Sequence, residues 1–137
     1  MRDLNQEAVR PVLNLLTFQH EVGEWSRKNF GNQPSTNPLL GVGEEVGELF
    51  HAHLKNLQGI RMSPAEARAK KEDAIGDILV YLADYCEREA ISLEAAAYTA
   101  WDGVRRRNWV ENPRDAHLKA EAPQFREPDD RAKRLER

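Results

Sequence analysis

The sequence predicts an all-α fold, and three observations support this class. Apolar residues recur at steps of three and four in four successive segments, which is the period of an amphipathic helix. Helix-start signals precede the later segments. No stretch of useful length alternates apolar and polar residues as a strand would. We therefore predict four main helices that form an antiparallel bundle.

The first two helices are expected on either side of a loop. Apolar positions predict a helix over about residues 7–29, and the segment FGNQPSTNP at 30–38 has the composition of a loop. Asn37 as a cap and Pro38 at the first helical position predict the start of a second helix, which should run to about Leu57.

The third and fourth helices follow two further start signals. Ser63, Pro64 and Glu66 form a capping box that opens a helix lasting to about Ala90. Ser92 is expected to cap a fourth helix that extends to Trp109. Its inward stripe is predicted to be Leu93, Ala97, Trp101 and Val104. Residues 1–112 then form one helical domain, and the charged, proline-containing segment 113–137 is predicted to be an extended or partly disordered tail.

Charge and composition narrow the range of partners. The chain has 20 basic and 23 acidic residues, and its net charge of −3 gives no indication of a nucleic-acid surface. Neither a signal peptide nor a membrane span is apparent, so we predict a cytoplasmic protein with no membrane partner. Cys86 is the sole cysteine, and we predict a buried, unreactive thiol.

Two helices each carry an acidic face. Helical geometry groups Glu44, Glu45 and Glu48 on one side of the second helix, while the opposite side is apolar: Leu39, Val46, Phe50 and Leu57. The third helix groups Asp73, Asp77 and Asp84, opposed by Ile75, Leu79, Leu82 and Cys86. Acidic faces are usually solvated, but like charges four residues apart destabilise a helix unless something compensates them.

The arrangement favours a cation site. Val80 and Tyr81 beside Asp77 indicate that the third helix is buried on more than one side. Gly47 and Gly76 adjoin the acidic faces, and we expect these glycines to let the two helices approach closely. Five carboxylates would then converge, and an all-oxygen donor set selects Mg²⁺ or Mn²⁺ over zinc. The five are Glu44, Glu45, Glu48, Asp73 and Asp77.

Histidines give a weaker metal signal. Glu48 and His51 form Glu-x-x-His, half of the di-iron bundle signature, and no second copy of that motif follows. A di-iron centre is therefore not favoured. His53 falls on the apolar face, where we expect a core histidine.

With GVGEEVGELFHA and EDAIGDILVYLADY on successive helices, the chain resembles the MazG-like all-α nucleoside triphosphate pyrophosphatase superfamily. FQHEVGEWSRKNF and WDGVRRRNW, on the first and fourth helices, are also similar to that superfamily. The resemblance covers about residues 10–112. It implies a homodimer or homotetramer.

The resemblance assigns the acidic residues. Glu44, Glu45 and Glu48 match its first acidic motif, and Asp77 matches the aspartate of the second. The glutamate expected three residues before Asp77 is Ala74 here, which leaves Asp73 as its natural substitute. Metal ligands are thus expected to be Glu45, Glu48, Asp73 and Asp77, with Glu44 or Glu45 activating the attacking water.

Substrate contacts are expected from four parts of the chain. Asn108 matches a phosphate-binding asparagine of related enzymes, and helical spacing from Val104 predicts that its amide faces the bundle. A lysine is usual three residues later, where this chain has Glu111, so phosphate contacts are expected to shift to Arg105, Arg106 or Lys55. Three aromatic residues are candidates to stack on the base: Trp25, Phe30 and Tyr81.

The resemblance implies Mg²⁺-dependent hydrolysis of a nucleoside triphosphate, as either the ribo or the deoxy form, to a monophosphate and pyrophosphate. Nucleotide-pool house-cleaning is the role we expect. A phosphoribosyl-ATP pyrophosphatase is the related alternative. A non-catalytic helical oligomer that binds a metal or a nucleotide is the alternative from another class, and Ala74 is its best argument.

Overall fold

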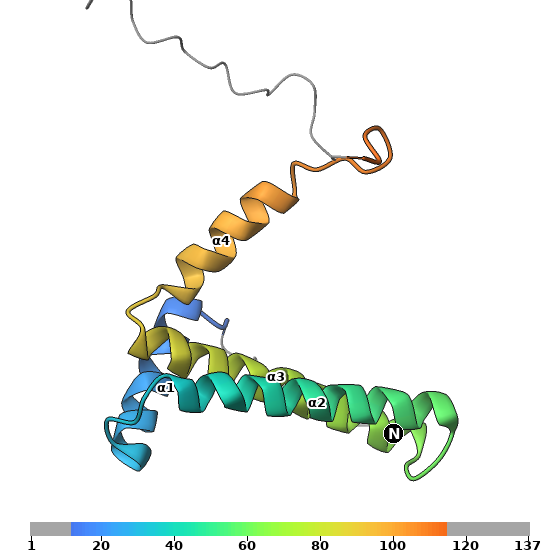
Figure 1. Ribbon diagram of the computed structural model, residues 1–137, viewed down its shortest axis with the longest axis horizontal. Helices are drawn as coiled ribbons and strands as arrows, with labels where there is room; N and C mark the ends of the chain where they lie inside the picture. The colour runs from blue at the N-terminus through green and yellow to red at the C-terminus, as the bar shows by residue number, and fades with distance from the viewer. Residues whose placement is uncertain (1–11, 115–137) are drawn as a thin grey trace, which may run out of the picture. The chain divides into compact units, whose positions relative to one another are not determined.

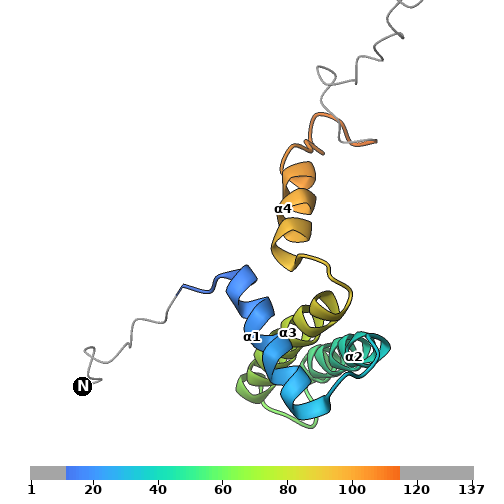
Figure 2. The same cartoon turned by 90° about the vertical axis from the view of Figure 1, so that its left-hand side faces the viewer.

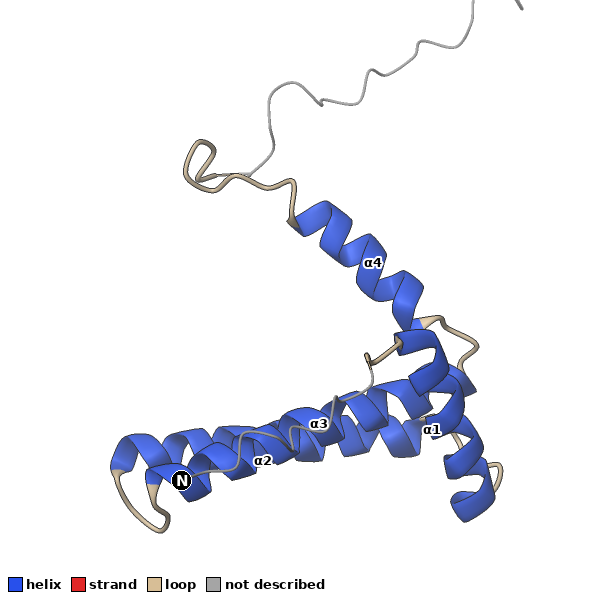
Figure 3. Cartoon of the chain, turned by 180° about the vertical axis from the view of Figure 1, so that it is seen from behind, coloured by secondary structure: helices blue, strands red, loops and turns tan. Residues whose placement is uncertain are grey.

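The computed structural model describes residues 12–114, and this part of the chain contains helices and loops but no strand (Figure 3). The helices are α1 (Leu15–Phe30), α2 (Thr36–Gln58), α3 (Pro64–Arg88) and α4 (Leu93–Val104). The predicted all-α class with four helices is confirmed. Residues 7–11 of the first predicted helix and the tail beyond residue 114 lie outside the described residues. Residues 12–14 are described and are not helical, so the predicted start of the first helix is wrong and α1 begins at Leu15.

Local capping explains where α1 and α3 begin. Asn14 caps α1, because its Oδ1 accepts a hydrogen bond from the Thr17 N–H at 3.0 Å. The predicted capping box of α3 is confirmed, since Ser63 and Glu66 exchange hydrogen bonds of 3.2 and 2.7 Å. These bonds from Ser63 lower the pKa of the Glu66 carboxyl. The third helix then runs without interruption to Arg88.

Two further predicted boundaries differ from the structure. Ser35 is the N-cap residue of α2, two residues before the predicted Asn37 cap. The Ser92 hydroxyl does cap α4, accepting from the Ala95 N–H at 3.1 Å, but α4 ends at Val104 and not at Trp109. The run of three arginines after Val104 gives no apolar face that would prolong the helix.

Small residues bring α2 and α3 together. The two helices run antiparallel and side by side for most of their length (Figure 1). Buried positions on α2 are Pro38, Gly41 and Ala52, and buried alanines on the N-terminal half of α3 are Ala67 and Ala74. Without long side chains between them, the two backbones approach closely.

The C-terminal half of α3 also packs against α1 (Figure 2). The predicted burial of α3 on more than one side is therefore confirmed. A buried polar network joins the two helices: the Ser26 hydroxyl donates to Asp84 at 2.7 Å, and Arg88 donates to both. Arg88 also donates to the Gln33 carbonyl at 2.8 Å, which fixes the loop between α1 and α2.

The core is smaller than the apolar patterning predicts. Cys86 is buried as expected, and burial raises the pKa of its thiol. Several side chains that were expected opposite the acidic faces are exposed: Leu39, Phe50, Leu57, Ile75 and Leu79. His53 is exposed as well, so its assignment as a core histidine is wrong. The buried apolar residues are mostly alanines.

The chain divides into two compact units between Ala97 and Tyr98. In the second unit, the predicted inward residues Trp101 and Val104 are exposed, as are Tyr98 and Trp109. The buried stripe predicted for the fourth helix is therefore wrong for the single chain, since α4 has no buried residue. Within residues 12–114, none of the helices has the length and apolarity needed to cross a bilayer.

Candidate functional site

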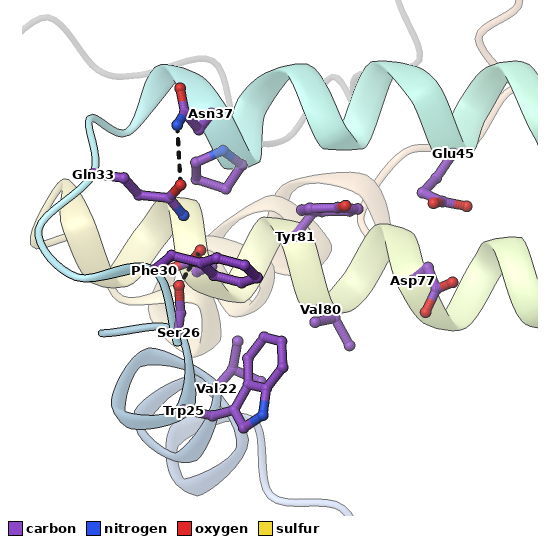
Figure 4. A pocket seen from close by; sticks show the side chains of 12 residues that line it. Val22, Trp25, Ser26, Phe30, Gln33, Asn37, Glu45, Asp77, Val80 and Tyr81 are labelled. Atoms are coloured by element: carbon purple, nitrogen blue, oxygen red, sulfur yellow. Dashed lines mark hydrogen bonds between the residues drawn. The ribbon is translucent and has the colours of Figure 1, made fainter. Parts of the chain in front are cut away.

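A cavity of about 400 Å³ lies between the C-terminal half of α3, the N-terminal half of α2, and α1 (Figure 4). Carboxylates stand at one end of it, from Glu45 on α2 and Asp77 on α3. Aromatic side chains stand at the other. The remaining lining residues are Val22, Trp25, Ser26, Phe30, Gln33, Asn37, Pro38, Val80, Tyr81 and Asp84.

The acidic end brings together the two predicted acidic faces. Glu45 is partly buried beside the α2–α3 contact, and it lies within electrostatic reach of all four other predicted carboxylates. The pKa of Glu45 is raised, first by partial burial and then by the negative charge of Asp77. Smaller contributions to this rise come, in order, from Glu48, Glu44 and Asp73.

Among the described residues, no positively charged side chain is paired with this cluster. None of the ion pairs and side-chain hydrogen bonds between described residues involves any of the five carboxylates. Asp84, which the sequence places on the same stripe, differs because Arg88 pairs with it at 2.8 Å. Asp84 therefore belongs to the structural network and not to the acidic end.

The donor chemistry fits a hard divalent cation. The acidic end offers carboxylate oxygens alone, which suit Mg²⁺ or Mn²⁺. Within residues 12–114, however, no three of these side chains lie close enough together to form a ready-made metal group. Glu45 and Asp77, which face the cavity from neighbouring helices, are the residues best placed to hold such an ion, with Glu48 and Asp73 flanking them.

Close approach of the helices does not depend on the predicted glycines. A Cβ added at Gly47 or Gly76 would meet no atom within 4 Å, so that explanation of these glycines is wrong for the single chain. A Cβ at Gly41 would instead meet the Tyr81 ring at 2.4 to 2.6 Å. Ala74, where the resemblance leads one to expect glutamate, is only 2% exposed and packs at the same helix contact.

The other end of the cavity is aromatic and amide-lined. Trp25 and Phe30 meet edge to face, with ring centroids 5.5 Å apart, and Tyr81 lies opposite them (Figure 4). Burial, followed by the charges of Glu44, Glu45 and Asp77, raises the pKa of the Tyr81 phenol. The Asn37 amide donates to Gln33 Oε1 at 3.0 Å at the same end. The three predicted stacking residues thus share one cavity.

The remaining predicted substrate contacts are placed differently. Lys55 does not line the cavity, and its ammonium donates to Gln58 at 2.8 Å. Arg105 and Arg106, in the second unit, both bind Asp102. Asn108 lies beyond the end of α4, where its Oδ1 accepts from the N–H groups of Val110 and Glu111. The helical spacing that predicted an inward amide does not apply there.

Sequence reasoning missed two features of the cavity. The sequence places Gln33 only in a loop. Its position in the structure depends on a hydrogen bond from Arg88, 55 residues away, to the Gln33 carbonyl. Gly41 was overlooked in favour of Gly47, because a pattern on one helix does not show which of its faces meets a neighbour. The only signal in the sequence is the spacing of Pro38, Gly41 and Ala52, which places three residues without long side chains on one side of α2.

No protein-family model matches this chain, and no curated protein matches it at a significant level.

Proposed function

We propose that this protein is a MazG-like, Mg²⁺-dependent nucleoside triphosphate pyrophosphatase that acts on nucleotides of the ribo or the deoxy series. One observation carries the proposal: a single cavity joins an aromatic, amide-lined end to an end bearing uncompensated carboxylates. A nucleotide has the matching polarity, since its base is flat and hydrogen-bonding and its triphosphate enters such sites with a divalent cation.

The aromatic end supports base binding. Trp25 and Phe30 provide a rigid edge-to-face pair, and Tyr81 provides a second flat surface. A tyrosine is neutral at physiological pH, and the raised pKa of the Tyr81 phenol moves it further from ionisation, so it adds no repulsion toward phosphates. Gln33 and Asn37 supply amide groups at the same end.

The acidic end supports phosphate chemistry. Glu45, Glu48, Asp73 and Asp77 would hold the cation, which when bound neutralises and orients the phosphates. Glu44 lies beside Glu45 and outside the cavity lining, and either carboxylate would accept the proton of the attacking water. The raised pKa of Glu45 makes its carboxylate a stronger proton acceptor than a carboxylate with an ordinary pKa.

The reaction assay distinguishes cleavage between the α and β phosphates, which releases pyrophosphate, from cleavage that releases orthophosphate. The chain is incubated with Mg²⁺ and a panel of ribo- and deoxynucleoside triphosphates plus phosphoribosyl-ATP, and pyrophosphate is measured separately from orthophosphate. We expect pyrophosphate and the monophosphate. Orthophosphate alone would mean that a different bond is cleaved, and no product from any nucleotide would reject the enzyme.

Matched variants test the site. Glu48→Gln and Asp77→Asn remove one charge each with little change in shape, and we expect at least a hundredfold loss of kcat with helicity unchanged in circular dichroism. Glu21→Gln is the control, because Glu21 is an exposed acid on α1 away from the cavity lining. Near-normal turnover in Asp77→Asn would disprove the acidic site.

A non-catalytic binder is the second candidate, and burial of Ala74 favours it. The missing carboxylate cannot be supplied there without disturbing the helix contact, so one ligand of the expected set is absent. Such a protein would bind nucleotide and Mg²⁺ without turnover. Quenching of tryptophan fluorescence by a nucleotide, together with no product, would identify it.

The proposal includes self-association as a homodimer or homotetramer. It is supported by the many large apolar side chains that α2 and α3 leave exposed. Sedimentation equilibrium over a range of concentrations measures the state.

A further inference from the structure

The outer face of α2 carries a regular apolar seam. Its members follow one another at steps of three, four, three, four and three, which is the heptad spacing of a coiled coil. They are Leu40, Gly43, Gly47, Phe50, Leu54 and Leu57, and we name them the outer seam. No charged residue interrupts it.

Within the described residues 12–97, the outer seam is left exposed. Its four large side chains are 47% to 72% exposed, and a Cβ added at Gly43 or Gly47 would meet no atom within 4 Å. The contact with α3 uses the opposite side of α2, at Gly41 and Ala52. By helical geometry the two sides lie roughly 180° apart, so a partner on the outer seam would not compete with α3.

The seam fits an antiparallel copy of itself, because its small residues then lie opposite large residues of the second copy. If a second α2 runs antiparallel, with its centre between Glu48 and Leu49, each layer pairs residues whose numbers sum to 97. Leu40 then meets Leu57, Gly43 meets Leu54, and Gly47 meets Phe50 of the second copy. Every glycine receives a large side chain, and every layer holds at least one.

A parallel pair would lack this fit. Gly43 and Gly47 would each meet another glycine and leave two empty layers, while Phe50 would oppose Phe50. Empty apolar layers are destabilising because they forfeit packing contacts. The size pattern thus favours one orientation.

Charge on the edge of the seam agrees with the antiparallel register. Glu44 and His51 are exposed and flank the seam on the same side. In the antiparallel pair, Glu44 lies within about half a helical turn of His51 of the second copy, and symmetry forms that contact twice. In a parallel pair, the two-fold axis would place Glu44 and His51 of the second copy on opposite sides of the seam, so this contact would not form.

We infer that the outer seam of α2 is the interface for a second copy of this chain, which pairs antiparallel about a two-fold axis near residues 48 and 49. The inference does not depend on the proposed activity. It places the two acidic ends on neighbouring segments of one α2–α2 pair, since Glu44 takes part in both the edge contact and the acidic face.

Cysteine crosslinking tests both the partner and the direction. Leu40→Cys and Leu57→Cys are made separately in a Cys86→Ala background, and the chains are oxidised alone or after co-expression. Each chain then holds a single cysteine, so any disulfide must join two chains. We expect covalent dimer from the co-expressed pair, and at least tenfold less from either variant alone.

Each other outcome overturns the inference. Dimer from Leu40→Cys alone would mean parallel pairing, and no crosslink in any sample would mean that something else, such as α4, covers the seam or that nothing does. Both substituted leucines are exposed, so the variants are expected to fold, which circular dichroism checks. The assay needs no nucleotide, so its failure and the failure of the proposed function are read independently.

A size exchange tests the layers. Gly47→Phe should raise the dimer dissociation constant at least tenfold, because it places two phenylalanines in one layer. The double variant Gly47→Phe/Phe50→Ala restores one large and one small residue to that layer and should recover most of the affinity. A dissociation constant unchanged in Gly47→Phe would contradict the register.

Discussion

At the scale of single residues, the acidic end brings negatively charged carboxylates close enough to repel one another. Glu45 shows this most clearly, because partial burial and four neighbouring carboxylates all raise its pKa. A group whose pKa is raised by folding favours the protonated form of the folded chain. Its contribution to stability is therefore present at low pH and is lost as the pH rises through the folded-state pKa.

Glu45→Gln should stabilise the metal-free protein at pH 7. Removing the charge relieves the repulsion, and we expect the free energy of unfolding to rise by up to about 1 kcal/mol, since solvent screens part of the field. The gain should shrink toward zero as the pH falls below the ordinary range of a carboxylate. Urea unfolding in EDTA at several pH values measures it.

Glu21→Gln serves as the control for that measurement, because Glu21 is exposed and has no ion pair with a described residue. Equal effects of the two substitutions would argue against a special field at Glu45.

Ala74→Glu should destabilise the fold. Ala74 is buried where α2 meets α3, so a longer, charged side chain must displace its neighbours or lose hydration, which costs roughly 1 to 3 kcal/mol. The same substitution at exposed Ala69, five residues earlier on α3, should cost less than about 0.5 kcal/mol. Thermal unfolding compares them, and equal costs would show that the contact at Ala74 is not tight.

At the scale of the elements, α3 carries two ion pairs with the same spacing of four residues, and we expect them to contribute very differently to the free energy of unfolding. Arg88 and Asp84 are paired with side chains 7% and 9% exposed, whereas Arg68 and Glu72 are 78% and 61% exposed. Breaking a buried pair leaves an uncompensated charge, while an exposed pair contributes little.

Arg88→Met should cost about 3 kcal/mol or more of unfolding free energy, and Arg68→Met at most about 0.5 kcal/mol. Arg88→Met should also loosen the α1–α2 loop, because the Gln33 carbonyl loses its donor. Hydrogen exchange of residues 31–35 reports on the loop. Similar unfolding free energies for the two variants would refute the structural role of the network.

The elements also show what a sequence can predict. Capping at Ser63 and Ser92 depends on neighbours three residues away, so both caps were predictable. The contact faces were not, because α2 has small residues on two sides, and Gly41 and Gly47 look alike in the sequence. The end of α4 at Val104 was not predictable from spacing, because Asn108 continues the helical spacing of the stripe by one turn.

At the scale of the whole molecule, the sequence predicted the class of fold better than the core. The acidic faces were predictable because helical spacing alone places these carboxylates on one side of each helix. The core was not, since exposed Leu39 and Phe50 carry the same pattern as buried residues would.

Divalent cations should stabilise the folded protein in a pH-dependent way. Mg²⁺ at millimolar concentration should raise the melting temperature by several degrees at pH 7, and by much less at pH 4, where protonation competes for the same oxygens. EDTA should reverse the effect. Asp77→Asn should reduce the shift, and a shift that Asp77→Asn leaves intact would place the ion elsewhere.

The Tyr81 ring rests against a residue that has no side chain. Because Gly41 leaves no space for a methyl group, any substitution there must move the ring, and the ring forms one wall of the cavity. Gly41 does not line the cavity, but the absence of a side chain there fixes the position of the Tyr81 ring and therefore the width of the cavity. A change of ligand size preference could therefore arise from position 41 without altering any group that touches the ligand.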